Sequence, residues 1–226
     1  MKPLKRLPIA LFLCLTLSMA SAQISKNPGD FNKVKVFDKI TLELIPSDVA
    51  RVELSGPGSD EVELINRNGE LRIRMKRTKF LAGESVEARV HYVSLQSIEA
   101  AEGSVVNSGS KIDTPHLELS AVESAEIKLS VDVENLVTKA NRGGKIEVLG
   151  NAESHRATLG TGGELRAEKL ETSVTQVSVN AGGTAQVRAS ETVEARVNAG
   201  GSIEVYGKPK VIDEKIVLGG SVRKME

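Results

Sequence analysis

The sequence predicts an all-β protein, a right-handed parallel β-helix (a β-solenoid) with about 19 residues per turn. Three observations lead to this fold. Paired small residues recur at a nearly constant interval, apolar residues alternate with polar ones around each pair, and aromatic residues are scarce. A β-sandwich is the alternative. It is disfavoured because successive hairpins need neither a constant period nor the same turn at every corner.

The segment before Gln23, residues 1–22, is expected to be a secretory signal peptide and to lie outside the fold. A basic start (MKPLKR), an apolar run (IALFLCLTLSMA) and small residues before Gln23 (ASA) follow one another as such a signal requires. A transmembrane anchor is the alternative, but the run is shorter than the roughly 20 apolar residues that span a bilayer. Lipid attachment at Cys14 is disfavoured because the bulky Leu13 precedes it. We therefore expect an exported bacterial protein that is periplasmic, outer-surface or secreted.

Composition excludes several classes of function. Residues 1–22 hold three of the 30 basic residues, the one cysteine and no acidic residue, so the remaining chain has a formal charge of −3. This nearly neutral surface gives no electrostatic footprint for nucleic acid. No cysteine is left for disulfides or thiol chemistry, and we expect no integral membrane segment after signal cleavage.

The fold prediction rests on pairs of small residues in the second half of the chain. Successive glycine pairs begin 19, 20, 18 and 19 residues apart. Two degenerate copies, Ser124-Ala125 and Glu102-Gly103, precede them, so the sequence predicts seven turns. The glycine pairs are Gly143-Gly144, Gly162-Gly163, Gly182-Gly183, Gly200-Gly201 and Gly219-Gly220.

Each pair separates two short alternating segments. VSVNA precedes the pair at Gly182, TAQV follows it, and the other copies keep the same alternation. A period of two points one side chain inward and the next outward along a β-strand. A single copy has no core of its own, so the copies are expected to stack and bury their inward faces, with Val179 over Val197. The core is then thin and aliphatic, which agrees with the absence of tryptophan.

The glycine pairs are expected at the corners of the coil. Glycine adopts positive φ without strain, and asparagine tolerates it next best. The position two residues before the first four pairs is Asn141, Gly160, Asn180 and Asn198, which predicts an asparagine ladder at the bend. A phosphate cradle is the alternative, but no pair precedes a helix. A calcium-binding β-roll would need an aspartate at fixed spacing after each pair, and none is present.

The outward positions predict a solvated column of stacked side chains. Three residues after the second member of each pair, opposite charges or neutral amides follow one another from turn to turn. Cross-strand pairs of this kind help to fix the register of neighbouring strands. The column consists of Lys128, Glu147, Arg166, Gln186, Glu204 and Arg223.

Residues 31–226 are expected to form a single solenoid domain after a short linker at residues 23–30. Residues 31–95 alternate less regularly, with turns at Pro57-Gly58 and Asn68-Gly69, and are expected to be irregular early turns that begin the rod. Residues 96–226 are expected to be the regular repeats. The basic run Arg72–Lys79 is interpreted as a solvated edge, with a binding patch as the alternative.

Four features occur together in the chain after residue 22: the opening FDKITLELIPSDVARVEL, the segment NGELRIR, the small-Gly-Gly corners and a closing motif of Tyr206, Gly207 and Pro209. In these features the chain resembles the auto-transporter adhesin head GIN domain family, which occurs in bacterial envelope proteins, especially those of Bacteroidetes. The resemblance implies the same stacked β-solenoid and an adhesive role, and it brings no catalytic residue. The chain departs from the family in its corners, which read Asn/Ala-Gly-Gly rather than Ser-Gly-Ser-Gly.

Parallel β-helices also carry polysaccharide-active enzymes, so catalysis is a competing function. Glycoside hydrolysis needs two carboxylates at a defined gap. The aspartates of the repeats, Asp113, Asp132 and Asp213, are not expected to share a phase on neighbouring turns. His91, His116 and His155 occur singly and are expected at exposed turn or strand positions. The sequence therefore predicts no catalytic residue, no cofactor and no metal site.

We expect an exported interaction protein that binds an unidentified protein or polysaccharide of the cell envelope. The contacts are expected from polar columns and from loops such as GKPKVIDE at residues 207–214. Sugar binding by aromatic stacking is disfavoured because few aromatic residues are available. A passive envelope scaffold is the alternative, and it predicts no saturable partner.

Overall fold

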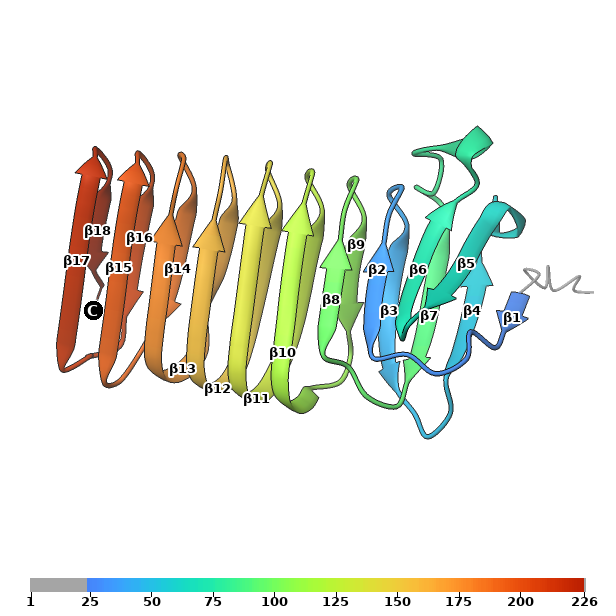
Figure 1. Ribbon diagram of the computed structural model, residues 1–226, viewed down its shortest axis with the longest axis horizontal. Helices are drawn as coiled ribbons and strands as arrows, with labels where there is room; N and C mark the ends of the chain where they lie inside the picture. The colour runs from blue at the N-terminus through green and yellow to red at the C-terminus, as the bar shows by residue number, and fades with distance from the viewer. Residues whose placement is uncertain (1–23, 226) are drawn as a thin grey trace, which may run out of the picture.

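The computed structural model describes residues 24–225 and shows a long rod of stacked β-strands (Figure 1). Strands hold 65% of the residues and helices 3%, in about seven turns of about 19 residues each. The predicted β-solenoid is therefore confirmed. The expected signal peptide, residues 1–22, lies outside the described residues. No helix between residues 24 and 225 is long and apolar enough to cross a membrane.

The regular part of the rod consists of parallel strands stacked in register. Residues one turn apart lie side by side: Ile127 pairs with Ile146, and Ile146 pairs with Leu165. In Figure 1 the near strands run upward and the far strands downward while the chain advances from right to left, which is a right-handed coil. These strands are β8 (Ser97–Ala100), β9 (Val105–Ser108), β10 (Ile112–Val122), β11 (Glu126–Asn141), β12 (Lys145–Leu159), β13 (Glu164–Val179), β14 (Thr184–Arg188), β15 (Thr192–Ala199), β16 (Ser202–Tyr206), β17 (Val211–Leu218) and β18 (Ser221–Lys224).

Two faces of the rod carry the outward side chains. The near face is formed by β8, β15, β17 and the second halves of β10 to β13, and the far face by β9, β14, β16, β18 and the first halves of β11 to β13. The strands β11 to β13 each continue around the bend that joins the far face to the near face.

Two neighbouring turns differ from the usual 19 residues: the turn from Gly162 to Gly182 has 20 residues and the turn from Gly182 to Gly200 has 18. Glu147 of β12 pairs with Arg166 of β13, whereas Leu149 pairs with Lys169, so β13 holds one extra residue as a β-bulge. The next turn is shorter at the bend, where β14 ends at Arg188 and β15 begins at Thr192. The one longer and one shorter interval between glycine pairs thus reflect an insertion and a compensating deletion.

The core is a thin stack of aliphatic side chains between the two faces. Val179 and Val197 pair in register and are fully buried, as predicted. Phe31 and Tyr92 are the buried aromatic residues of the described chain, and both belong to the amino-terminal half. Because burying one aliphatic side chain contributes about 1.5–3 kcal/mol, the repeated stack is the main source of stability.

The order of turns along the chain differs from their order in space at the amino-terminal end. β2 (Lys33–Val36) and β3 (Thr41–Pro46) form one turn, and β6 (Glu70–Met75) and β7 (Glu87–Tyr92) form the next turn in sequence. However, β2 pairs in parallel with both β6 and β8, and β3 pairs with both β7 and β9. The turns of residues 31–95 are therefore out of sequence order in space: their first turn lies between their second turn and the regular repeats.

The amino-terminal end is closed by antiparallel strands. β5 (Val62–Arg67) forms a hairpin with β6, β4 (Arg51–Ser55) pairs with β7, and β1 (Ile24–Lys26) pairs with β4. Two short 3-10 helices, η1 (Ser59–Glu61) and η2 (Arg77–Lys79), complete this end. Residues 24–26, expected within a linker, thus belong to the cap. Antiparallel capping strands interrupt the parallel stack at the end of the rod, which guards against edge-to-edge association.

At the corners that begin with Gly143, Gly162 and Gly182 only the first glycine has a positive φ, whereas both glycines do at Gly200-Gly201 and Gly219-Gly220. Gly143 has a φ of 77°, a left-handed conformation that residues with a Cβ adopt with strain. Gly144 lacks a positive φ, but a Cβ there would lie 2.0 Å from the carbonyl oxygen of Ala121 in the preceding turn. Attributing positive φ to both glycines is therefore wrong at this corner, because the second glycine provides space rather than conformational freedom.

The asparagine ladder spans two turns. The Nδ2 atom of Asn198 donates to Oδ1 of Asn180 at 2.7 Å. Asn141 does not continue the ladder, because its Oδ1 accepts a hydrogen bond from the backbone N–H of Arg142 at 2.8 Å. Gly160 occupies the turn between Asn141 and Asn180, and a Cβ there would lie 2.3 Å from Oδ1 of Asn141.

Candidate functional site

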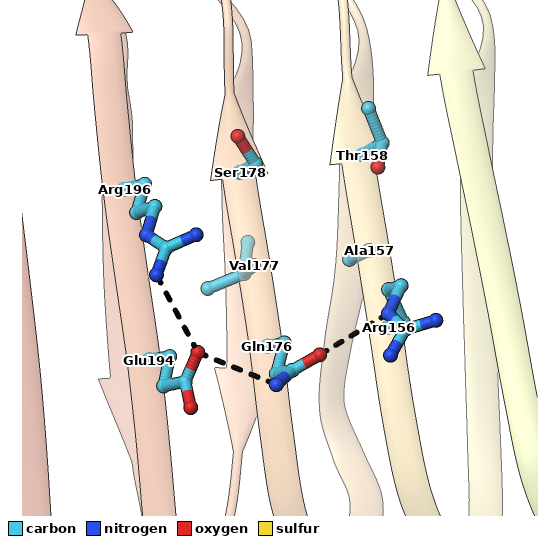
Figure 2. A pocket seen from close by; sticks show the side chains of 8 residues that line it. All are labelled: Arg156, Ala157, Thr158, Gln176, Val177, Ser178, Glu194 and Arg196. Carbon is cyan, nitrogen blue, oxygen red and sulfur yellow. Dashed lines mark hydrogen bonds and ion pairs between the residues drawn. The ribbon is translucent and has the colours of Figure 1, made fainter.

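A row of polar side chains crosses the near face on β12, β13 and β15 (Figure 2). Arg156, Gln176 and Glu194 pair in register on these strands. The Nε atom of Arg156 donates to Oε1 of Gln176 at 3.1 Å, and Nε2 of Gln176 donates to Oε2 of Glu194 at 3.3 Å. The Nη2 atom of Arg196 lies 3.8 Å from the same carboxylate oxygen. We call Arg156, Gln176, Glu194 and Arg196 the near-face array.

A surface hollow of about 170 Å³ lies beside the near-face array. It is lined by the short side chains of Thr158 and Ser178, which pair on β12 and β13. The longer side chains of Lys139 and Arg196 occupy the turns on either side in the same column. Two short residues between two long ones therefore leave room for the hollow. Figure 2 shows Thr158 and Ser178 beside the near-face array.

A second hollow of about 300 Å³ continues from the first toward β11. Arg156 and Gln176 line both hollows. The second hollow also contains Asn135 and Ser154, and the Ser154 hydroxyl donates to Oδ1 of Asn135 at 2.8 Å. The two hollows form a continuous polar strip across neighbouring turns of the rod.

The polar strip presents guanidinium and amide donors, hydroxyl groups and a carboxylate on strands that lie about 4.8 Å apart. An extended polymer with polar groups along its length would meet a polar side chain on each of the three turns of the row, Arg156, Gln176 and Glu194. Apolar side chains of the aliphatic core support the strip from below, with Ala157 and Val177 buried between its outward residues. The arrangement suits binding through many hydrogen bonds rather than enclosure of a small molecule.

The far face carries the predicted column, and its register is confirmed from Lys128 to Arg223. The Nζ atom of Lys128 lies 3.0 Å from Oε1 of Glu147, and Nε2 of Gln186 donates to Oε2 of Glu204 at 2.9 Å. The hollow beside this column has a volume of about 70 Å³, and a hollow of about 180 Å³ lies farther along the same face on β3, β7 and β9. The far-face column thus has the same residue types as the near-face array beside a smaller hollow.

His155 lies in the core, so the expectation of an exposed position is wrong for this residue. It occupies the inward column between Leu136 and Thr175 and is 2% exposed. Its Nε2 atom lies 2.9 Å from Oγ1 of Thr138, whereas Nδ1 has no hydrogen-bond partner among the described residues. Burial lowers the pKa of His155 from 6.5 to about 4, so the ring is neutral at neutral pH.

The other two histidines lie far from each other. His116 is exposed, as predicted, and lies at the rim of the second hollow. The expectation of an exposed position is also wrong for His91 on β7, whose side chain is 12% exposed and whose Nε2 atom lies 3.5 Å from Oε1 of Glu53.

Across residues 24–225, no three His, Cys, Asp or Glu side chains form a group that could hold a metal ion. Asp113 of β10 and Asp132 of β11 pair in register, so the expectation that no two aspartates of the repeats share a phase is wrong. Asp132 also forms an ion pair with Lys111.

A sequence profile of one protein family matches residues 30–209, and that family is described as "Putative auto-transporter adhesin, head GIN domain". The chain belongs to the head GIN domain family. Comparison with functionally curated proteins gives no match.

Solved structures share the fold of this head GIN domain protein at low sequence identity. A "putative adhesin" from Bacteroides fragilis has a TM-score of 0.84 and 15% identity, with 92% of this chain and 98% of that chain covered. A "putative adhesin" from Parabacteroides distasonis has a TM-score of 0.73 and 19% identity, with 91% and 98% covered. A "putative lipid binding protein" from the same species has a TM-score of 0.72 and 15% identity, with 92% and 98% covered. These likenesses support the solenoid fold.

The family motif lies on the far face at the end of β16. The Tyr206 hydroxyl donates to Oε2 of Glu204 at 3.3 Å. The pKa of Tyr206 is raised, mainly by partial removal from water and also by the negative charge of Glu204. Gly207 has a φ of 83°, and a Cβ there would lie 2.6 Å from the carbonyl oxygen of Ala189. Pro209 follows in the connection to β17. The conformation of Gly207 gives this part of the head GIN motif a structural role at a turn.

Sequence reasoning does not single out the near-face array. Its signal is present in the sequence, because Arg156, Gln176 and Glu194 follow one another at intervals of one turn. However, the first of these turns is the bulged one and the second is the shortened one. A search at one constant period therefore fails to align the three positions.

Proposed function

We propose that this head GIN domain protein is a non-catalytic interaction module of the bacterial cell envelope, exported by the segment that precedes Gln23. We further propose that it binds a protein or polysaccharide through the near-face array and its two hollows. Membership of a family described as adhesins supports a binding role.

The observation that carries the proposal is the preorganised row of polar side chains beside two hollows, both of which Arg156 and Gln176 line. Each side chain in the row from Arg156 through Gln176 to Glu194 is oriented by its neighbour, at 3.1 and 3.3 Å. A ligand therefore meets side chains that lose little conformational freedom on binding, which favours affinity. The far-face column has similar contacts but a smaller hollow, which makes it the natural control surface.

A catalytic function is less well supported by the chemistry of the strip. Acid–base catalysis needs a titratable group at the reacting atoms with a suitable pKa. The histidine with the strongly lowered pKa, His155, borders the second hollow but is only 2% exposed and occupies an inward position. A passive scaffold remains the competing function, and it differs by predicting no saturable ligand.

The test is a pull-down from bacterial envelope extracts with two matched triple variants. Arg156→Ala/Gln176→Ala/Arg196→Ala removes two guanidinium groups and one amide from the near face. Arg166→Ala/Gln186→Ala/Arg223→Ala removes the same groups from the far face. We expect the near-face variant to lose its bound protein or polysaccharide and the far-face variant to retain it. Equal retention by both variants would contradict the proposal, provided that thermal unfolding shows both to be folded.

The segment GKPKVIDE, expected as one loop, is divided in the structure. Residues 207–210 form the connection between β16 and β17, whereas residues 211–214 belong to β17. Only residues 207–210 can therefore be replaced by Gly and Ser without changing a strand. Including this replacement in the pull-down tests the loop separately, and an unchanged set of bound molecules would exclude it as a contact.

A further inference from the structure

One corner of the rod is much longer than its neighbours. β11 and β12 are joined by three residues and β12 and β13 by four, whereas β6 and β7 are joined by the eleven residues 76–86. This segment, which we call the corner loop, includes η2 and projects from the amino-terminal end of the rod (Figure 1). Insertions in a repeat protein form loops that often carry binding functions.

The corner loop combines exposed apolar side chains with basic ones. Residues 76–82 are all exposed. Phe80 is 60% and Leu81 is 38% exposed, and we call these two residues the tip of the corner loop. The corner loop holds three basic residues and one acidic residue, a formal charge of +2 in a chain whose total is zero. Lys76 pairs with Glu61 at 2.9 Å, which leaves Arg77 and Lys79 as the basic residues beside the tip.

Buried Asp38 holds the corner loop in a fixed conformation. Its Oδ2 atom accepts a hydrogen bond from the backbone N–H of Met75 at 2.9 Å, and Oδ1 accepts one from Leu81 at 2.8 Å. The backbone N–H of Gly83 donates to the carbonyl oxygen of Asp38 at 3.0 Å. Leu81 is held at a φ of 59°, a conformation that is strained for a residue with a Cβ. The surrounding contacts thus fix a backbone that points Phe80 and Leu81 away from the core.

We propose that the corner loop docks this protein onto an anionic lipid bilayer. Phe80 and Leu81 enter the boundary between headgroups and acyl chains, while Arg77 and Lys79 contact the phosphates of the headgroups. A bilayer suits this tip better than a protein partner does, because a specific protein interface buries at least about 1,000 Å² and two apolar side chains supply little of that area. The site lies apart from the near-face array and does not depend on its function.

A single tryptophan placed at the tip tests the proposal directly, because the chain contains no tryptophan. Phe80→Trp keeps an aromatic side chain at the tip. We expect its fluorescence to shift to the blue when vesicles of phosphatidylglycerol are added, and to stay unchanged with vesicles of phosphatidylcholine alone. Val93→Trp is the control, because Val93 is 62% exposed and lies beyond the opposite end of β7. The control should show no shift with either vesicle.

The basic residues are tested in the Phe80→Trp background. Each cation near an anionic surface contributes about a fivefold change in partitioning, so Arg77→Ser/Lys79→Ser should weaken vesicle binding by roughly 25-fold. Lys208→Ser/Lys224→Ser removes the same charge at the other end of the rod and should have a much smaller effect. Three results would overturn the proposal: no blue shift with phosphatidylglycerol, an equal shift in the Val93→Trp control, or equal weakening by the two double substitutions. The residues changed are exposed, and thermal unfolding checks that each variant is folded.

Discussion

The buried imidazole of His155 makes the stability of the protein depend on pH in a defined window. The pKa of His155 is about 4 in the folded protein and 6.5 without burial. Between these values the unfolded chain binds a proton at this residue and the folded chain does not, so the free energy of unfolding falls as the pH falls from about 6.5 to about 4. The effect is absent above this window and complete below it.

The size of this effect follows from the two pKa values of His155. One pH unit corresponds to about 1.4 kcal/mol, so a pKa that drops from 6.5 to about 4 removes about 3 kcal/mol of stability. That is a substantial part of the 5–15 kcal/mol that stabilises a typical folded protein. The cause is burial alone, since the neighbouring side chains Leu136, Thr138 and Thr175 carry no charge.

The assay is urea unfolding at a series of pH values for the wild type and for His155→Gln. The glutamine does not titrate, and its amide can replace the contact with Thr138. We expect the wild type to lose about 3 kcal/mol more than His155→Gln between pH 7 and pH 4. The control His116→Gln, at an exposed position, should follow the wild type. Parallel stability curves for the wild type and His155→Gln would refute the reasoning, because all other titrating groups are shared.

Three further predictions concern the corners, the far-face column and the end of the rod. Gly144→Ala should lower the free energy of unfolding by about 2 kcal/mol or more, because its Cβ would lie 2.0 Å from a carbonyl oxygen. Gly182→Ala should lower it by about 1 kcal/mol, because the residue has a φ of 65° but a Cβ there would have no atom within 4 Å. Equal losses in urea unfolding would contradict the two roles. Glu147→Lys places like charges in one column and should lower the melting temperature, whereas Glu147→Gln should barely change it; equal effects would contradict the column. Glu214 on the last near-face strand pairs with fully buried Ala195, so it occupies an inward position at an open edge, where a charge discourages strand addition. Glu214→Val should therefore cause concentration-dependent association in analytical ultracentrifugation, and an equal effect of outward Lys215→Val would contradict this role.

The regular part of the fold is predictable from the sequence because its constraints are local and repeated. Each corner needs the same backbone geometry, so small residues recur in pairs, and each strand has one buried side, so apolar residues alternate. Val179 over Val197 and the contact between Asn180 and Asn198 follow from this pattern. Lys128 to Arg223 likewise fall into one column because they share a position relative to the corner.

The amino-terminal order of turns is not predictable by the same reasoning, because it depends on pairing between distant segments. β2 pairs with β6 and β8, and nothing in its four residues specifies two partners so far along the chain. The position of His155 escapes prediction for a related reason. His155 follows Leu136 by 19 residues, the regular turn, but precedes its other neighbour Thr175 by 20 residues. The β-bulge in β13 causes this longer turn, and it is evident only from the strand register.

The near-face array illustrates the limit for functional residues. The sequence predicts that Arg156 and Gln176 point outward, but the hollow beside them arises from short Thr158 and Ser178 standing between longer neighbours on separate turns. The corner loop has a stronger signal, since the basic run Arg72–Lys79 is followed by Phe80 and Leu81. The structure divides that run: Arg72 and Arg74 lie on β6 between β2 and β5, and only the residues after Met75 belong to the loop.

The central claim is that the rod binds an envelope component through its near face. The most direct measurement is a saturation-binding isotherm of the labelled protein, without residues 1–22, on isolated bacterial envelopes. The account predicts saturable binding that unlabelled protein displaces, that Arg156→Ala/Gln176→Ala/Arg196→Ala abolishes and that Arg166→Ala/Gln186→Ala/Arg223→Ala preserves. Binding that rises linearly without saturation, or that both variants retain equally, would contradict the claim and favour a passive scaffold.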